Sequence, residues 1–95
     1  MDAMAPAVTH NEASQRFEAV VDGLLCRCDY RMHGDTMMLV HTEVPPQLEG
    51  RGIASHLVEA AFEHAKSRGW DVLPVCSYVR TWVRRHPEYE SLLAG

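Results

Sequence analysis

The chain has 95 residues, of which 46% are hydrophobic and 23% are charged, and its formal net charge is −4. This length allows one domain, and the composition excludes a disordered tail, a coiled coil or a collagen-like repeat. The negative charge argues against general nucleic-acid binding, because phosphate contacts need surplus positive charge. The sequence has neither an apolar run of about eighteen residues nor a signal-peptide pattern. We therefore expect no membrane contact and a cytoplasmic location.

The first half of the chain predicts an antiparallel meander. Residues 1–10 lack periodicity and contain Pro6, so we expect a loose leader there and a single domain over residues 11–95. Residues 16–21 are predicted to form a strand, followed by Asp22-Gly23, a hairpin signal that favours positive φ angles. Residues 26–32 alternate apolar and polar, as a half-buried strand does. Residues 36–44 form a third predicted strand, which stops pairing at Pro45-Pro46.

The second half predicts two helices around a short strand. From residue 54, the apolar positions follow the spacing of one helix face; they are Ala54, Leu57, Val58, Ala61, Phe62 and Ala65. Gly69 matches a helix stop, residues 71–76 a strand, and residues 78–85 a second helix. A strand, helix and strand in succession imply parallel pairing through a crossover. The predicted fold is therefore α+β, with a mixed sheet and the order β-β-β-α-β-α.

A loop with two glycines, Gln47-Leu48-Glu49-Gly50-Arg51-Gly52, joins the third predicted strand to the long helix. Glycine lets the backbone turn sharply and approach a ligand closely, and the following helix offers unpaired N–H groups and the positive end of its dipole. The pattern predicts a phosphate-binding turn, with a simple tight connection as the alternative. It lacks the Lys-Ser or Lys-Thr of a P-loop and the third glycine of the dinucleotide-binding fingerprint.

The string Gln47-x-x-Gly50-x-Gly52 resembles the Q/R-x-x-G-x-G/A signature of the GNAT superfamily of acetyl-CoA-dependent N-acetyltransferases. Its place between a strand and a helix is the one that this signature requires. Residues 41–45, 54–57, 60–65 and 74–79, and His86-Pro87-Glu88-Tyr89, also look like the small single-domain members of that superfamily. The resemblance covers residues 11–93 and implies a minimal GNAT fold with acetyl-CoA, or coenzyme A, as the cofactor.

The resemblance also implies which residues hold the cofactor. In the superfamily, backbone N–H groups of the signature loop bind the pyrophosphate of CoA, which here implicates Gln47, Leu48, Glu49, Gly50, Arg51, Gly52, Ile53 and Ala54. The end of the preceding strand, Thr42 to Val44, is expected to pair with the pantetheine arm. Arg51, and then Arg80 or Arg84, are candidates to meet the outlying phosphate; the alternative for these arginines is a solvated position on the surface.

Acetyl transfer to an amine needs a base, an oxyanion site and an acid for the departing thiolate. Glu43 lies near the place where many members of the superfamily keep a carboxylate base, although alternation along the strand can turn its side chain away from the groove. His41 shares its face in a regular strand, and histidine is the side-chain type best suited to base catalysis at neutral pH. The alternative for His41 is a purely structural histidine.

Two further candidates follow the last predicted strand. Cys76 lies where the resemblance places the gap that admits the thioester, so its thiolate could accept the acetyl group before the amine does. The alternative for Cys76 is a small buried hydrophobic residue, which is the usual role of a free cysteine. We expect Cys26 and Cys28 to be core residues. Tyr78 is a candidate proton donor to the leaving thiolate, or a packing residue. We expect neither a disulfide nor a metal site.

The acceptor side is expected to be open. Larger members of the superfamily place one or two helices between their first strands, whereas Asp22-Gly23 joins those strands directly here. We therefore expect the acceptor amine to belong to a protein or peptide, and the chain to be a monomer or a weak homodimer. The alternative function is a non-catalytic module that binds CoA or acyl-CoA and acts through a partner.

Overall fold

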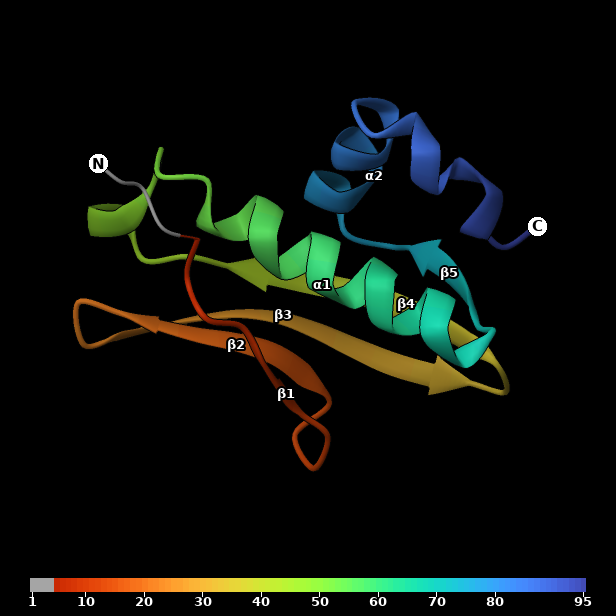
Figure 1. Ribbon diagram of the computed structural model, residues 1–95, viewed down its shortest axis with the longest axis horizontal. Coiled ribbons are helices and arrows are strands. Elements are labelled where there is room, and N and C mark those ends of the chain that lie inside the picture. The colour runs from red at the N-terminus through yellow and green to blue at the C-terminus, as the bar shows by residue number, and fades with distance from the viewer. Residues whose placement is uncertain (1–4) are drawn as a thin grey trace.

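Five strands form one mixed sheet in the computed structural model, which describes residues 5–95 (Figure 1). The strands are β1 (Thr9–Asn11), β2 (Arg16–Val21), β3 (Leu24–His33), β4 (Thr36–Glu43) and β5 (Asp71–Pro74), and they lie in this order across the sheet. The first four are antiparallel, whereas β5 runs parallel to β4. The predicted α+β class, meander and mixed sheet are confirmed.

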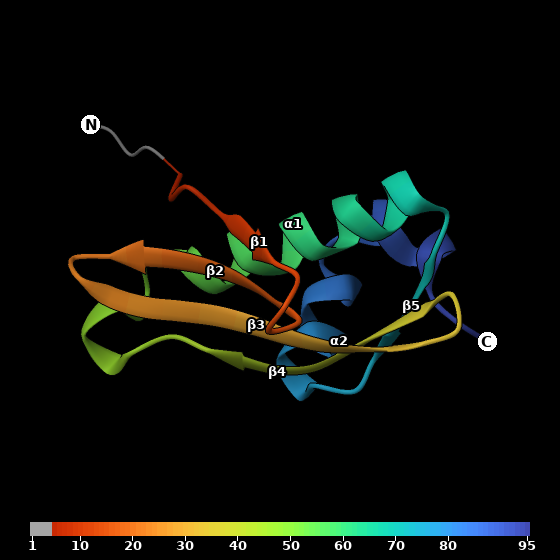
Figure 2. The same cartoon turned by 90° about the horizontal axis from the view of Figure 1, so that it is seen from below.

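Two α-helices and two short 3-10 helices complete the chain: η1 (Pro46–Leu48), α1 (Ile53–Arg68), α2 (Ser77–Arg84) and η2 (Pro87–Leu92). α1 lies across one face of the sheet (Figure 2). It ends as predicted at Gly69, whose φ of 72° lets its N–H reach the carbonyls of Ala65 and Lys66. β5 ends at Pro74, two residues before the predicted end, because the chain turns there toward α2.

Alternating side chains of β2, β3 and β4 bury one face of the sheet against α1. The buried residues of the strands are Phe17, Ala19, Cys26, Cys28, Tyr30, Met37 and Leu39, and those of α1 are Ile53, Leu57, Val58, Ala61, Phe62 and Ala65. α2 packs beside α1, where the ring of Trp82 stacks on Phe62 with centroids 5.3 Å apart. The indole N–H of Trp82 also donates to the Ser55 hydroxyl at 2.8 Å, which ties α2 to the first turn of α1.

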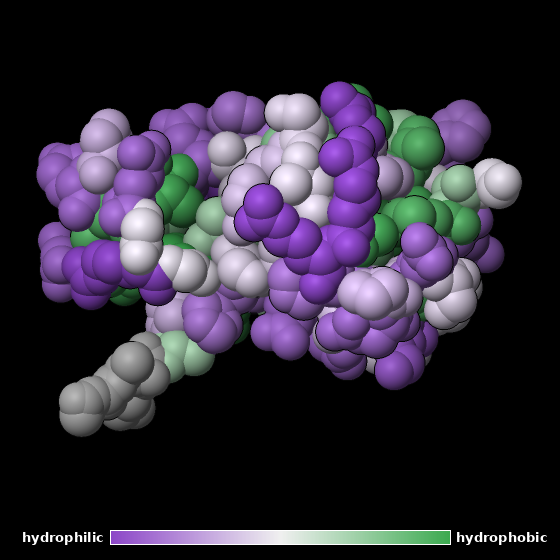
Figure 3. Space-filling view, turned by 90° about the horizontal axis from the view of Figure 1, so that it is seen from above, coloured by the Kyte–Doolittle hydropathy of each residue, from purple (hydrophilic) through white to green (hydrophobic). Residues whose placement is uncertain are grey.

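Hydrophilic side chains dominate the surface seen in Figure 3, with apolar residues in a few separate areas. The large apolar side chains that stay exposed are Val20, Leu25, Leu73, Val75 and Tyr78. In the described part of the chain, neither helix is both long and apolar enough to cross a bilayer.

One prediction was wrong at its boundary. Thr9 and His10, which we placed in a loose leader, belong to β1 and pair with Glu18 and Phe17 of β2. The remainder of the leader has no regular structure over residues 5–8, and residues 1–4 lie outside the described residues. A strand of three residues carries too little periodicity to be predicted, and its position depends on contacts with distant side chains.

Those contacts form an aromatic cluster around His10. The His10 ring stacks on Phe17 with centroids 4.4 Å apart and meets the His64 ring edge-on at the same separation. His10 Nε2 lies 2.6 Å from the Tyr30 hydroxyl. Burial lowers the pKa of His10, as do the nearby His64 and Arg68, while Glu12 opposes the shift.

We expect protonation of His10 to destabilise the fold. Because the pKa of His10 is lower in the folded chain, the unfolded chain binds the proton more readily, and the free energy of unfolding falls as the pH drops below about 6.5. Urea denaturation at pH 7.5 and pH 5 measures this loss. A His10→Phe variant keeps the stacking and cannot titrate, so its loss should be smaller. An equal loss in both proteins would contradict the prediction.

Candidate active site

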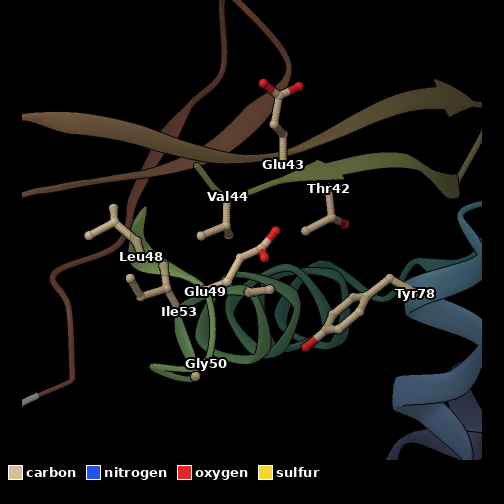
Figure 4. Close-up of a pocket in the computed structure, with 10 residues that line it drawn as sticks. Thr42, Glu43, Val44, Leu48, Glu49, Gly50, Ile53 and Tyr78 are labelled. Carbon is tan, nitrogen blue, oxygen red and sulfur yellow. The ribbon is translucent and has the colours of Figure 1, made fainter. Parts of the chain in front are cut away.

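A cavity of about 470 Å³ lies between the end of β4 and the start of α1 (Figure 4). This volume lies in the range of small-molecule sites. Nine of the ten lining residues come from one stretch of chain, and the tenth comes from α2; they are Thr42, Glu43, Val44, Leu48, Glu49, Gly50, Gly52, Ile53, Ala54 and Tyr78. The cavity is therefore built by the segment in which the sequence predicts cofactor binding.

The upper wall of the cavity is the free edge of β4. Pairing between β4 and β5 ends at Leu39 and Pro74. The backbone N–H groups of Val75 and Cys76 then both donate to the Leu39 carbonyl, at 3.0 and 2.9 Å, and the chain turns into α2. Beyond Leu39, no described residue forms a strand on this side of β4. Its last residues thus offer an unpaired strand edge to an extended ligand.

The lower wall is the glycine turn and the N-terminus of α1. Gly50 and Gly52 have φ angles of 85° and 79°, a backbone conformation that glycine adopts without strain. The first α-helical hydrogen bond runs from His56 N–H to the Gly52 carbonyl, so the N–H groups of the preceding helical residues have no partner within the helix. No acidic residue stands in the first turn of α1. The turn therefore presents donors and a positive dipole end to the cavity.

A β-bulge decides which side chains of β4 face the cavity. His41 pairs with Asp29 while Leu39 pairs with Tyr30, which leaves Val40 as an extra residue in β4. The extra residue reverses the alternation of side chains. Thr42 consequently lies opposite the buried Cys28 and points into the cavity.

His41 and Glu43, the predicted bases, consequently lie on the other face of the sheet. Glu43 points away from the cavity (Figure 4), and His41 Nε2 lies 3.1 Å from Glu43 Oε1. Arg27 donates to the same Glu43 oxygen at 3.0 Å and also pairs with Asp29. The hydrogen bond from His41, together with the charge of Arg27, lowers the pKa of Glu43, so this exposed carboxylate is ionised at neutral pH. The structure brings these side chains together, but apart from the cavity.

The hydroxyl of Thr42 lies between two cysteines, an arrangement that the sequence did not reveal. Thr42 Oγ1 donates to Cys28 Sγ and accepts from Cys76 Sγ, each at 3.8 Å. Burial raises the pKa of Cys28 to about 12, so this thiol stays protonated at neutral pH. Cys76 is half-buried behind Thr42 and does not itself line the cavity. Only the bulge at Val40 brings Thr42 to this position, and nothing in the sequence pattern marks the bulge.

Tyr78 stands on the opposite side of the cavity from the strand edge. Its hydroxyl points toward the glycine turn (Figure 4), and burial raises its pKa, so the phenol is protonated at neutral pH. Tyr78 lies one helical turn before Trp82, whose bond to Ser55 fixes α2 beside the start of α1.

The three candidate arginines lie outside the lining of the cavity. Arg51 pairs with Asp22 of the β2–β3 hairpin at 2.9 Å. Arg80 donates to the carbonyls of Pro74 and Val75, at 3.3 and 2.7 Å, and Arg84 is exposed at the end of α2. Gln47 is also exposed and does not line the cavity. Within residues 5–95, no three histidine, cysteine or acidic side chains gather as a metal site would require.

A family model described as GCN5-related N-acetyl-transferase matches residues 16–92. The chain belongs to this family of GCN5-related N-acetyl-transferases. Among its family relatives, Protein NATD1 of Xenopus tropicalis is 32% identical over 94 residues, covering 92% of this chain and 86% of the relative. Protein NATD1 of Homo sapiens is 31% identical over 83 residues, covering 84% of this chain and 74% of the relative.

The fold of this GCN5-related protein also matches a solved structure. A GCN5-like protein of Staphylococcus aureus, determined by NMR in solution, aligns with a TM-score of 0.75, covering 98% of this chain and 92% of that one. The two sequences are 22% identical, so this likeness shows the fold alone. It confirms the predicted GNAT architecture.

The glycine turn should be sensitive to any added Cβ atom. At Gly52, a Cβ atom would meet no heavy atom within 4 Å in the described chain apart from its immediate neighbours, so the cost is backbone strain at a positive φ. We expect Gly52→Ala to lower the free energy of unfolding by about 1–2 kcal/mol. Gly52→Asn should cost less, because asparagine tolerates this conformation better. Urea denaturation measures both, and a Gly52→Ala protein as stable as the unchanged chain would contradict the prediction.

Proposed function

We propose that this protein transfers an acetyl group from acetyl-CoA to an amine on a protein or peptide. The observation that carries the proposal is the meeting of three features in one cavity: the free edge of β4, the turn through Gly50 and Gly52, and the N-terminus of α1. Membership of the family supports the same chemistry. The cytoplasmic location, the absence of nucleic-acid partners and the oligomeric state remain predictions from the sequence.

The lining of the cavity fits coenzyme A. A diphosphate needs several donors at close approach, which the positive-φ glycines and the unpaired N–H groups at the start of α1 supply. A pantetheine arm is extended and carries amides, so the backbone edge at Thr42 to Val44 can pair with it as a strand would. A hydrophobic floor is present in Leu48 and Ile53, which are buried and line the cavity.

Acetyl transfer then requires three events, two of them at the carbonyl carbon of the thioester and one at the amine nitrogen. The amine nitrogen attacks the carbonyl carbon to form the C–N bond, the C–S bond breaks, and the amine loses a proton to a base. We assign stabilisation of the oxyanion to a backbone N–H at the free edge of β4. We assign Tyr78 as the proton donor to the thiolate, because it is protonated and faces the cavity.

The base on this proposal is the His41–Glu43 pair. It lies on the face of the sheet opposite α1, next to the place where β5 leaves β4, so an amine that approaches from that face meets it first. Within residues 5–95, no helix lies between β2 and β3, which are joined directly through Asp22 and Gly23, so this face of the sheet has no helical wall. An amine on a large partner suits such an open surface, since the partner brings its own contacts.

Acetyl-CoA-dependent thiol release with a peptide library tests the proposal. Gly50→Glu places a carboxylate and a strained residue in the glycine turn, and we expect it to lower thiol release by at least about tenfold, or 1.4 kcal/mol in transition-state binding. Gly34→Glu is the matched control, because Gly34 also has a positive φ but lies in the β3–β4 turn. No release above the level of Gly50→Glu would overturn the transferase. CoA binding without thiol release would instead support the alternative function, a non-catalytic module that binds CoA and acts through a partner.

Mass measurement of the intact protein separates two routes of transfer. We expect direct attack by the amine, because Cys76 lies behind Thr42 and not in the lining of the cavity. The unchanged chain should then carry no acetyl group after brief exposure to acetyl-CoA, and Cys76→Ser should keep most of its activity. An acetyl adduct that disappears in Cys76→Ser would contradict direct attack and identify Cys76 as the nucleophile.

A further inference from the structure

Glu49 places a carboxylate inside the cavity that is proposed to hold a polyanion. Its side chain projects from the glycine turn into the cavity, toward Thr42 (Figure 4). The other lining carboxylate, that of Glu43, points to the opposite face of the sheet. The sequence marked Glu49 only for its backbone N–H, so its side chain has no role in the function proposed above.

No positive side chain offsets this charge. The ten residues that line the cavity include no lysine, arginine or histidine. Arg51, two residues from Glu49, is engaged with Asp22 at 2.9 Å on the outer side of the turn. Within residues 5–95, no salt bridge involves Glu49. Backbone N–H groups and the helix dipole therefore supply the positive potential of the cavity, and the Glu49 carboxylate opposes them.

We infer that Glu49 is an affinity-determining residue that weakens binding of the phosphates of CoA. The inference rests on the proposed function, because it takes CoA as the ligand of this cavity. When the diphosphate enters, the carboxylate either stays beside it and repels it, or rotates toward solvent and loses its place in the cavity. Both responses make CoA binding weaker than the donors alone would allow. A weaker complex releases its product faster, since affinity differences reside mainly in the dissociation rate.

Glu49→Gln tests this role, because it removes the charge and keeps the shape of the side chain. Glu49 is exposed, so the repulsion between like charges about 5 Å apart is screened almost as in water, which corresponds to a roughly three- to tenfold change in Kd. We therefore expect Glu49→Gln to bind CoA three- to tenfold more tightly by calorimetry at low salt. Glu90→Gln is the matched control: Glu90 is exposed in η2 and its replacement changes the net charge equally. Its Kd for CoA should stay within about twofold of the unchanged chain.

Pantetheine, which carries no phosphate, is the second probe. Its affinity should be the same for Glu49→Gln and the unchanged chain, and the gain for CoA should shrink as salt is added. Equal or weaker CoA binding by Glu49→Gln, or an equal gain for pantetheine, would overturn the role of Glu49. Tighter CoA binding without any thiol release would keep the role and overturn acetyl transfer. Failure of every variant to bind CoA would overturn both.

Discussion

The carbonyl of Leu39 is the point on which the rest of the site depends. It accepts the N–H groups of both Val75 and Cys76, and in doing so it ends the pairing of β5 with β4. Had β5 continued, its backbone would cover the edge of β4 and fill the cavity. Because β5 turns away, Thr42 to Val44 keep an open edge beside the glycine turn. The chain then enters α2, which places Tyr78 in the lining of the same cavity.

The charges are distributed unequally along the sequence. Residues 1–50 hold three basic and eight acidic side chains, a balance of −5, while residues 51–95 hold six basic and five acidic, a balance of +1. The basic side chains do not line the cavity, and Arg51 is held by Asp22. On the proposed function, anion binding would therefore depend on the backbone of the glycine turn and the start of α1, and little on the overall charge of the chain.

Much of this architecture follows from local patterns. The six apolar positions from Ala54 to Ala65 predicted α1 to within one residue of its start, since helix periodicity is set by near neighbours. The Asp22-Gly23 turn was predicted equally well, and both residues have the positive φ that it requires. The glycine turn lies between β4 and α1, as predicted. Each of these features is decided within a few residues along the chain.

The features that the sequence did not reveal depend on contacts between distant segments. β1 is held by His10 against Phe17, Tyr30 and His64, which come from three other elements. The bulge at Val40 depends on the register between β3 and β4, and it alone decides that Thr42, and not His41, faces the cavity. The alternation of side chains along a strand does not predict the bulge, because an extra residue leaves no trace in composition or spacing.

The bond between Trp82 and Ser55 has a mechanical consequence. It joins α2, the helix that carries Tyr78, to the first turn of α1, and the stacking of Trp82 on Phe62 adds a second contact between the two helices. Moving α2 outward to widen the cavity would therefore break both contacts. The segment between Val44 and Gly50, on the other side of the cavity, is also restrained, because it contains two prolines and the short turn of η1. Both sides of the cavity are thus held in place before any ligand enters, which reduces the ordering that binding would require.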